Sequence, residues 1–137
     1  MNGIIRGITV GAVALGAVAL APAPAQAAPV MPFQIQPAPF GNPNGSLDVP
    51  PIRCGLVRDG AGVVTVTGTR RDRWGCIPRA SVSWINLSTG RTGSARLSGG
   101  LNGHVPQVRL VTGRGQVVLT LGSAGGVMTP GYATIAA

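Results

Sequence analysis

The chain has 137 residues, with eleven arginines, no lysine, three aspartates and no glutamate, and its formal net charge is +8. Charged residues make up 10% of the chain, against about 25% in an average globular domain, whereas glycine and proline number 22 and 12. This length allows one domain. The scarcity of helix formers beside so many turn formers argues against a helical fold and favours short strands.

Residues 1–27 have the features of a secretory signal peptide. A short segment with one positive charge, Arg6, precedes the apolar run Ile8–Leu20, and Ala25 and Ala27 supply the small residues that a signal peptidase recognises. The alternative is a membrane anchor, but this run is shorter than the roughly 20 residues that a spanning helix needs. We expect cleavage after Ala27, export, and a mature chain with ten arginines and three aspartates, hence a charge of +7.

Residues 28–46 form a proline-rich segment that cannot be a helix or a central strand, because its prolines lack a backbone donor and favour extended structure. One interpretation is a mobile N-terminal arm that precedes the folded domain. The other is that its apolar residues, Phe33, Ile35 and Phe40, dock on the domain or on a partner. Under the first interpretation the domain spans residues 47–137.

The rest of the chain predicts an all-β domain of about seven short antiparallel strands. Glycine-rich turns, such as Asp59–Gly62 and Gly113–Gly115, separate segments that alternate apolar and polar residues. We expect strands at about 52–58, 63–69, 80–87, 91–97, 105–112, 116–121 and 132–136. This spacing of strands and turns is typical of a small sandwich or barrel.

Alternation within these strands predicts which residues face the core. The predicted core positions are Val64 with Val66, Val82 with Trp84, Val108 with Leu110, and Val117 with Leu119 and Leu121. The strand at 80–87 is ambiguous, because Ile85 and Leu87 are apolar on the opposite face. Trp84 is expected to fill the middle of the core.

Cys54 and Cys76, the only cysteines, predict one disulfide in an exported protein. If consecutive strands run antiparallel, both cysteines lie at the same end of the domain, and the bond stabilises the fold by about 3 kcal/mol. The alternative is redox chemistry, which the spacing does not favour. In antibody-type domains a tryptophan lies between the cysteines in sequence, whereas Trp84 follows both, so we expect the bond at one end of the sandwich.

The clearest charge cluster is Arg70, Arg71, Arg73 and Arg79 around Trp74, with Asp72 among them. Arginines beside an exposed aromatic residue can hold phosphate, carboxylate or a stacked base or sugar. The competing interpretation is a solvated loop in which Trp74 covers the disulfide. We retain these five residues as a candidate anion-binding surface.

Catalytic and metal chemistry find little support in the sequence. Three aspartates give no convincing pair of carboxylates, and the single histidine, His104, lies in a turn with no nucleophile elbow in the chain. One histidine and two paired cysteines do not supply the ligands of a zinc site. We therefore expect no enzyme activity, no metal and no cofactor, and Asn86–Ser88 is interpreted as a chance glycosylation sequon.

Three segments carry a resemblance to a known group: WINLSTGRTG (84–93), VTGRGQVVLTL (111–121) and TPGYATI (129–135). Together they resemble small secreted proteins of mycolate-type actinobacteria that have an immunoglobulin-like β-sandwich and no assigned activity. The resemblance covers about the last 55 residues. It implies this fold and an export route, and it carries over no catalytic residues.

The function expected from the sequence is that of a secreted or cell-envelope binding or structural module with a basic surface. Its partners are unknown. Anionic envelope polymers or lipids fit the charge, and nucleic acid does not fit export. The alternative is a small-ligand carrier of the exported β-sandwich type, which needs an apolar cleft.

Overall fold

The computed structural model describes residues 20–22, 28–39, 52–123, 125 and 127–137. The expected signal peptidase positions, Ala25 and Ala27, lie outside these residues, as does most of the predicted signal peptide. In the described part of the chain, we find no helix with the length and apolar character needed to cross a membrane.

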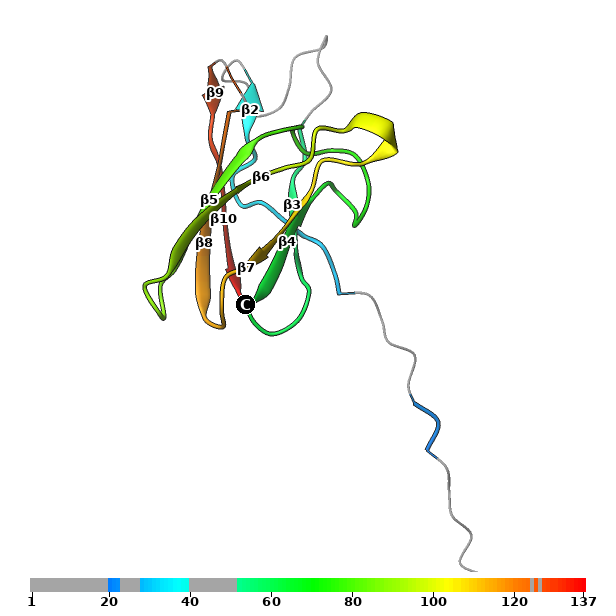
Figure 1. Cartoon of the computed structure of the whole chain (residues 1–137), viewed down its shortest axis with the longest axis vertical. Helices are drawn as coiled ribbons and strands as arrows, with labels where there is room; N and C mark the ends of the chain where they lie inside the picture. Colours follow the sequence, from blue (N-terminus) through cyan, green and yellow to red (C-terminus); the bar gives the residue numbers. More distant parts are fainter. Residues whose placement is uncertain (1–19, 23–27, 40–51, 124, 126) are drawn as a thin grey trace, which may run out of the picture.

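Two antiparallel sheets form two facing layers (Figure 1). The first has the order β1-β3-β4-β7 and the second the order β10-β8-β5-β6, and a small third sheet pairs β2 with β9. The strands are β1 Met31–Pro32, β2 Ala38–Pro39, β3 Gly55–Arg58, β4 Val63–Thr67, β5 Ser81–Asn86, β6 Thr92–Arg96, β7 Val108–Val111, β8 Gln116–Gly122, β9 Met128–Thr129 and β10 Gly131–Ala136. A short 3-10 turn, η1, covers Leu101–Gly103.

The connectivity is that of an immunoglobulin-like sandwich. Of the seven longer strands in chain order, the first, second and fifth (β3, β4, β7) share one sheet, and the third, fourth, sixth and seventh (β5, β6, β8, β10) share the other. This is a Greek-key arrangement, and it differs from the constant-type antibody domain because the fourth strand joins the sheet of the third. The predicted all-β sandwich is confirmed.

Period-2 alternation explains the core between the sheets. Along β8, residues Val117, Leu119 and Leu121 are fully buried while their neighbours are partly or fully exposed. The same pattern buries Val64 and Val66 on β4 and Ala133 and Ile135 on β10. Ile85 and Leu87 face outward and are exposed, which resolves the ambiguous strand.

Trp84 differs from the prediction that it fills the middle of the core. It faces inward but is only partly buried, at the margin of the apolar cluster. Its partner on the edge strand β6 is Gly93, and a Cβ on Gly93 would lie 2.5 Å from Cζ2 of the indole. The indole therefore covers Gly93, which has no side chain, at the edge of the sheet, and one side of the indole remains open to solvent.

The disulfide Cys54–Cys76 is present, with the two Cα atoms 4.5 Å apart. Cys54 precedes β3 and Cys76 precedes β5, so the bond lies at one end of the sandwich, as expected. Both cysteines are almost fully buried and belong to the core cluster.

The N-terminal segment corrects the predicted domain boundary at residue 47. Residues 28–39 are part of the sandwich: Met31 pairs with Leu56 in the first sheet, Ile35 bridges to Tyr132 beside the second, and Phe33 is 4% exposed in the core. The interpretation as an arm outside the domain is wrong for this stretch. Residues 40–46, including Phe40, lie outside the described part of the chain.

Glutamine side chains make this pairing possible in a segment rich in proline. Gln34 donates to the carbonyl of Thr134 and accepts from its N–H, at 3.3 and 2.9 Å. Gln36 forms the same pair of bonds with Cys54, at 3.0 and 2.7 Å. The amides thus replace strand hydrogen bonds that prolines cannot make, and they secure the segment to the edges of both sheets.

Candidate anion-binding surfaces

Arginine dominates the surface of the described chain. Ten arginines lie in the described residues and all ten are exposed, against two aspartates. The arginines are Arg53, Arg58, Arg70, Arg71, Arg73, Arg79, Arg91, Arg96, Arg109 and Arg114. Among these residues, Arg71 takes both aspartates as ion-pair partners, so the other nine arginines have no carboxylate partner in the described chain.

Arg71 does not belong with the candidate surface in which the sequence placed it. Its guanidinium forms an ion pair and a hydrogen bond with Asp59, and lies 3.8 Å from the carboxylate of Asp72. Asp59 also accepts a hydrogen bond from the Thr65 hydroxyl on the outer face of β4. Arg71 therefore fastens the β4–β5 loop to the outer face of the first sheet.

The pKa of Asp59 reflects this arrangement. Partial burial raises the pKa, but the hydrogen bonds from Thr65 and Arg71, with the charges of Arg71 and Arg109, outweigh that effect and hold the pKa of the Asp59 carboxyl below 3.8. The carboxylate form is thus favoured by folding. Its stabilisation is complete above the ordinary pKa and is lost as the pH falls through the lower folded-state pKa.

We expect Asp59→Asn to lower the free energy of unfolding at neutral pH by about 1 kcal/mol, a modest value because the Arg71 side chain is 43% exposed. The difference from wild type should shrink as the pH falls below the ordinary Asp value. Urea unfolding across an acid pH series measures both effects. Asp72→Asn is the matched control, because Asp72 is 67% exposed. A constant difference at all pH values would contradict the role of the Asp59 charge.

The other members of the predicted surface lie at the disulfide end. Trp74 and Arg79 converge on the glycines after β6: a Cβ on Gly100 would lie 2.5 Å from the Trp74 ring, and one on Gly99 would lie 3.0 Å from Nε of Arg79. Trp74 is 56% exposed. Arg70 and Arg73 are exposed in the same β4–β5 loop, joined by a backbone bond from the Arg73 N–H to the Arg70 carbonyl. We name Arg70, Arg73, Trp74 and Arg79 the disulfide-end group.

A second group, which sequence reasoning missed, lies at the opposite end of the sandwich. Arg58 and Arg114 line one solvent-open hollow of about 410 Å³, whose other lining residues are Gly60, Ala61 and Ala137. Arg91 lies on the neighbouring turn, with Nη1 3.3 Å from the position that a Cβ on Gly113 would take. We name Arg58, Arg91 and Arg114 the turn-end group.

One sequence signal could have found the turn-end group. Each of these arginines lies in or beside a turn, and the three turns connect β3 to β4, β5 to β6 and β7 to β8 (Figure 1). In an antiparallel sandwich, alternate connections return to the same end of the molecule. Strand direction therefore predicts that residues 58, 91 and 114 lie at one end.

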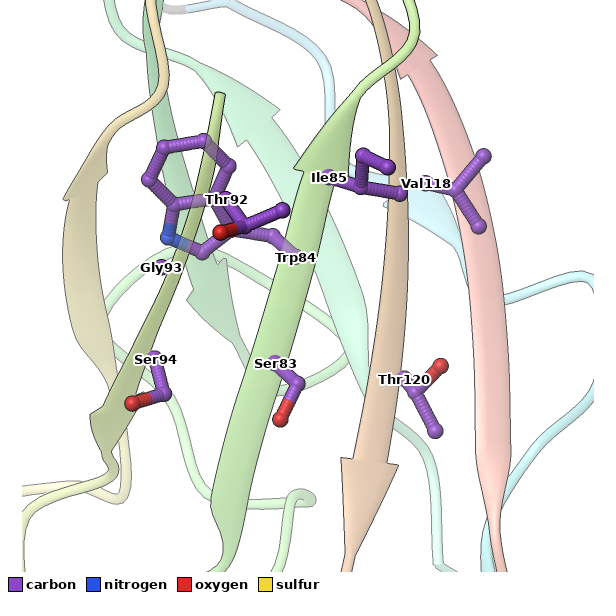
Figure 2. Close-up of a pocket in the computed structure, with 8 residues that line it drawn as sticks. All are labelled: Ser83, Trp84, Ile85, Thr92, Gly93, Ser94, Val118 and Thr120. Carbon is purple, nitrogen blue, oxygen red and sulfur yellow. The ribbon is translucent and has the colours of Figure 1, made fainter. Parts of the chain in front are cut away.

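The outer face of the second sheet carries a different, uncharged surface. A shallow hollow of about 460 Å³ lies there. Figure 2 shows its lining, with short hydroxyl side chains around Ile85 and Val118 and the Trp84 indole beside Gly93. The hydroxyls come from Ser83, Thr92, Ser94 and Thr120. None of the lining residues is titratable. The hollow is open to solvent, so it is not the enclosed cleft that a small-ligand carrier needs.

The described residues offer no cluster for metal binding: no three His, Cys, Asp or Glu side chains among them lie together as ligands. His104 is exposed in the connection between β6 and β7. The exposed guanidinium groups of the described surface can make electrostatic and hydrogen-bonding contacts with anions.

Comparisons with known proteins give one structural similarity. No family model matches the chain, and no curated protein matches it. Among solved structures, the chain is similar to a DUF3244 family protein from Bacteroides vulgatus with an immunoglobulin-like β-sandwich fold. The two chains are 13% identical, the TM-score is 0.40, and the match covers 78% of this chain and 99% of that one.

Proposed function

We propose that this protein is an exported, non-catalytic module that binds linear anionic polymers through its arginine side chains. The observation that carries the proposal is the excess of cations: nine exposed arginines have no carboxylate partner in the described part of the chain. Guanidinium is suited to this role, because its planar donors bind phosphate and carboxylate oxygens in pairs.

The distribution of arginines favours a polymer over a membrane surface. The disulfide-end group and the turn-end group lie at opposite ends of the sandwich, and Arg109 lies between them on β7. A planar bilayer can contact only one side of a rigid domain at a time. A flexible polyanion can follow the surface and contact arginines that face in different directions.

We expect the mature protein to bind polyphosphate tightly at low salt and to lose affinity steeply as salt rises. Each phosphate contact contributes about 0.7 to the slope of log affinity against log salt for a single-stranded polyanion, so R70Q/R73Q/R79Q should reduce the slope by about 2. Titration of fluorescent polyphosphate at a series of salt concentrations measures the slope.

Neutral dextran serves as the negative control in this experiment, and anionic vesicles containing phosphatidylglycerol provide the comparison with lipid. Absent or salt-independent binding to polyphosphate would overturn the proposal. Tighter binding to the vesicles than to polyphosphate would also overturn it, in favour of a lipid headgroup as the ligand.

A further inference from the structure

The turn-end group is held by a rigid framework rather than by separate loops. Asn86 is fully buried at the end of β5, and its side-chain amide donates to the carbonyls of Thr112, Gly113 and Arg114 at 3.0–3.2 Å. The same side chain accepts from the N–H groups of Ser88 and Thr89 at 3.0 and 3.2 Å. A single asparagine thus fixes the turn that carries Arg114 and the turn that precedes Arg91.

The third turn, which follows Arg58, is tied to the same framework. The carbonyl of Gly62 accepts from the N–H groups of Thr112 and Gly113, at 2.9 and 3.1 Å. Gly62 has a φ of 74°, and a Cβ there would lie 2.8 Å from the carbonyl carbon of Gly113. Only glycine allows this close approach. All three arginine-bearing turns are therefore fixed relative to one another before any ligand binds.

The carboxylate side chain nearest in sequence, that of Asp59, does not compensate this charge directly. Asp59 follows Arg58 directly, but its carboxylate is bound by Thr65 and Arg71 on the outer face of the first sheet. Positively charged side chains on a fixed backbone lose less conformational entropy on binding than those on a mobile loop. The turn-end group thus has the properties of a preorganised anion site.

The two arginine groups are too far apart to act as one site. Strand β8, Gln116–Gly122, runs from one end of the sandwich to the other, and the six steps between its seven residues, at about 3.3 Å each, span roughly 20 Å. The Debye length at physiological salt is about 8 Å. Each end therefore attracts its own segment of anion with little influence from the other.

We propose that Arg58, Arg91 and Arg114 form a second anion site, and that one molecule bridges two segments of polyanion, one at each end. The ligand at each site is a run of phosphate groups, or groups of similar charge, on a linear polymer. This proposal rests on the proposed polyanion binding and adds that the binding is bivalent. The protein would then act as a cross-linker between polymer chains.

A two-step capture experiment tests the bridging directly. Polyphosphate is fixed to a surface, the mature protein is bound to it, and a second, labelled polyphosphate is then passed over the layer. Wild type should capture the labelled polymer. R58Q/R91Q/R114Q and R70Q/R73Q/R79Q should each still bind the fixed polymer but lose capture of the labelled one. All proteins are first checked for equal unfolding midpoints.

The control is R109Q, on β7 between the two ends, which leaves both groups intact and should still capture the labelled polymer. If wild type binds the fixed polymer but captures no labelled polymer, as it would if one polymer occupied both ends, bridging is wrong. Bridging by two defined ends is also wrong if both single-end variants capture as well as wild type, or if the control loses capture to the same extent as they do. If wild type fails to bind the fixed polymer at all, polyanion binding itself is wrong, so the two failures are distinguishable.

Discussion

Asn86→Asp should destabilise the fold by at least about 3 kcal/mol, because a buried acceptor left without its donor costs about 1–3 kcal/mol. The substitution preserves shape and removes two N–H donors. The carboxylate would face the carbonyls of Thr112, Gly113 and Arg114, which the amide now binds. An ionised group there is repelled by three carbonyl dipoles, and a protonated one supplies a single donor.

Denaturation in urea, with the unfolding midpoint as readout, measures this loss. Asn102→Asp is the matched control: Asn102 is exposed in η1, has a φ of 55°, and makes no side-chain hydrogen bond among the described residues. Aspartate tolerates this backbone conformation, so the control should change stability by no more than about 0.5 kcal/mol. Equal midpoints for the two variants would show that the Asn86 network contributes little.

The same contacts bear on the sequon Asn86–Ser88. An asparagine accepts a glycan only when its amide nitrogen is accessible, and this nitrogen is fully buried and bound to three carbonyls. The folded domain therefore offers no glycosylation site at this position. The asparagine serves to join two turns.

Removal of the disulfide should lower the free energy of unfolding by an amount comparable to the effect of Asn86→Asp. Replacing both cysteines by alanine opens a loop with a sequence separation of 22 residues, which in the chain-entropy model costs about 3 kcal/mol. The buried sulfurs also belong to the core cluster, so their loss removes apolar contacts. The free energy of unfolding of a domain of this size is about 5–15 kcal/mol in total, so either substitution would remove a large part of it.

Guanidinium unfolding of the double-alanine variant, compared with oxidised and reduced wild type, measures this contribution. Reduced wild type should resemble the variant apart from the lost sulfur contacts. The effect should also appear at the disulfide-end group, because Cys76 lies within the β4–β5 loop that carries Trp74. A variant that unfolds at the wild-type midpoint would mean that the bond constrains little in the unfolded chain.

Much of the sandwich could be predicted because its signals are local. The alternation in Val117–Leu121 specifies a strand and its inward face without reference to any other segment. Strand direction then placed Cys54 and Cys76 at one end, where the bond lies. The positions of Trp84 and of residues 28–39 could not be predicted in this way, because they depend on segments distant in sequence. The burial of Trp84 depends on Gly93 across the ladder, and the pairing of Gln34 depends on Thr134, one hundred residues away.

The candidate site shows the same division. The clustering of Arg70 to Arg79 in the sequence suggested one surface. In the fold, Arg71 instead forms an ion pair with Asp59 and is separated from the other arginines of the cluster. Conversely, Arg58, Arg91 and Arg114 are far apart in sequence and lie on adjoining turns. The sequence alone cannot tell a paired arginine from a free one, because an arginine that binds a carboxylate and an arginine that faces solvent look the same in it.

By itself, the amino-acid sequence determined the all-β class, the strands, the disulfide and the excess of positive charge, since each follows from composition or from spacing within a short segment. Only the tertiary structure decided that residues 28–39 complete the sandwich, that Asn86 joins two turns and that the arginines form two groups at opposite ends. These features depend on hydrogen bonds and packing between segments distant in sequence, and the chain encodes their partners only through the fold as a whole.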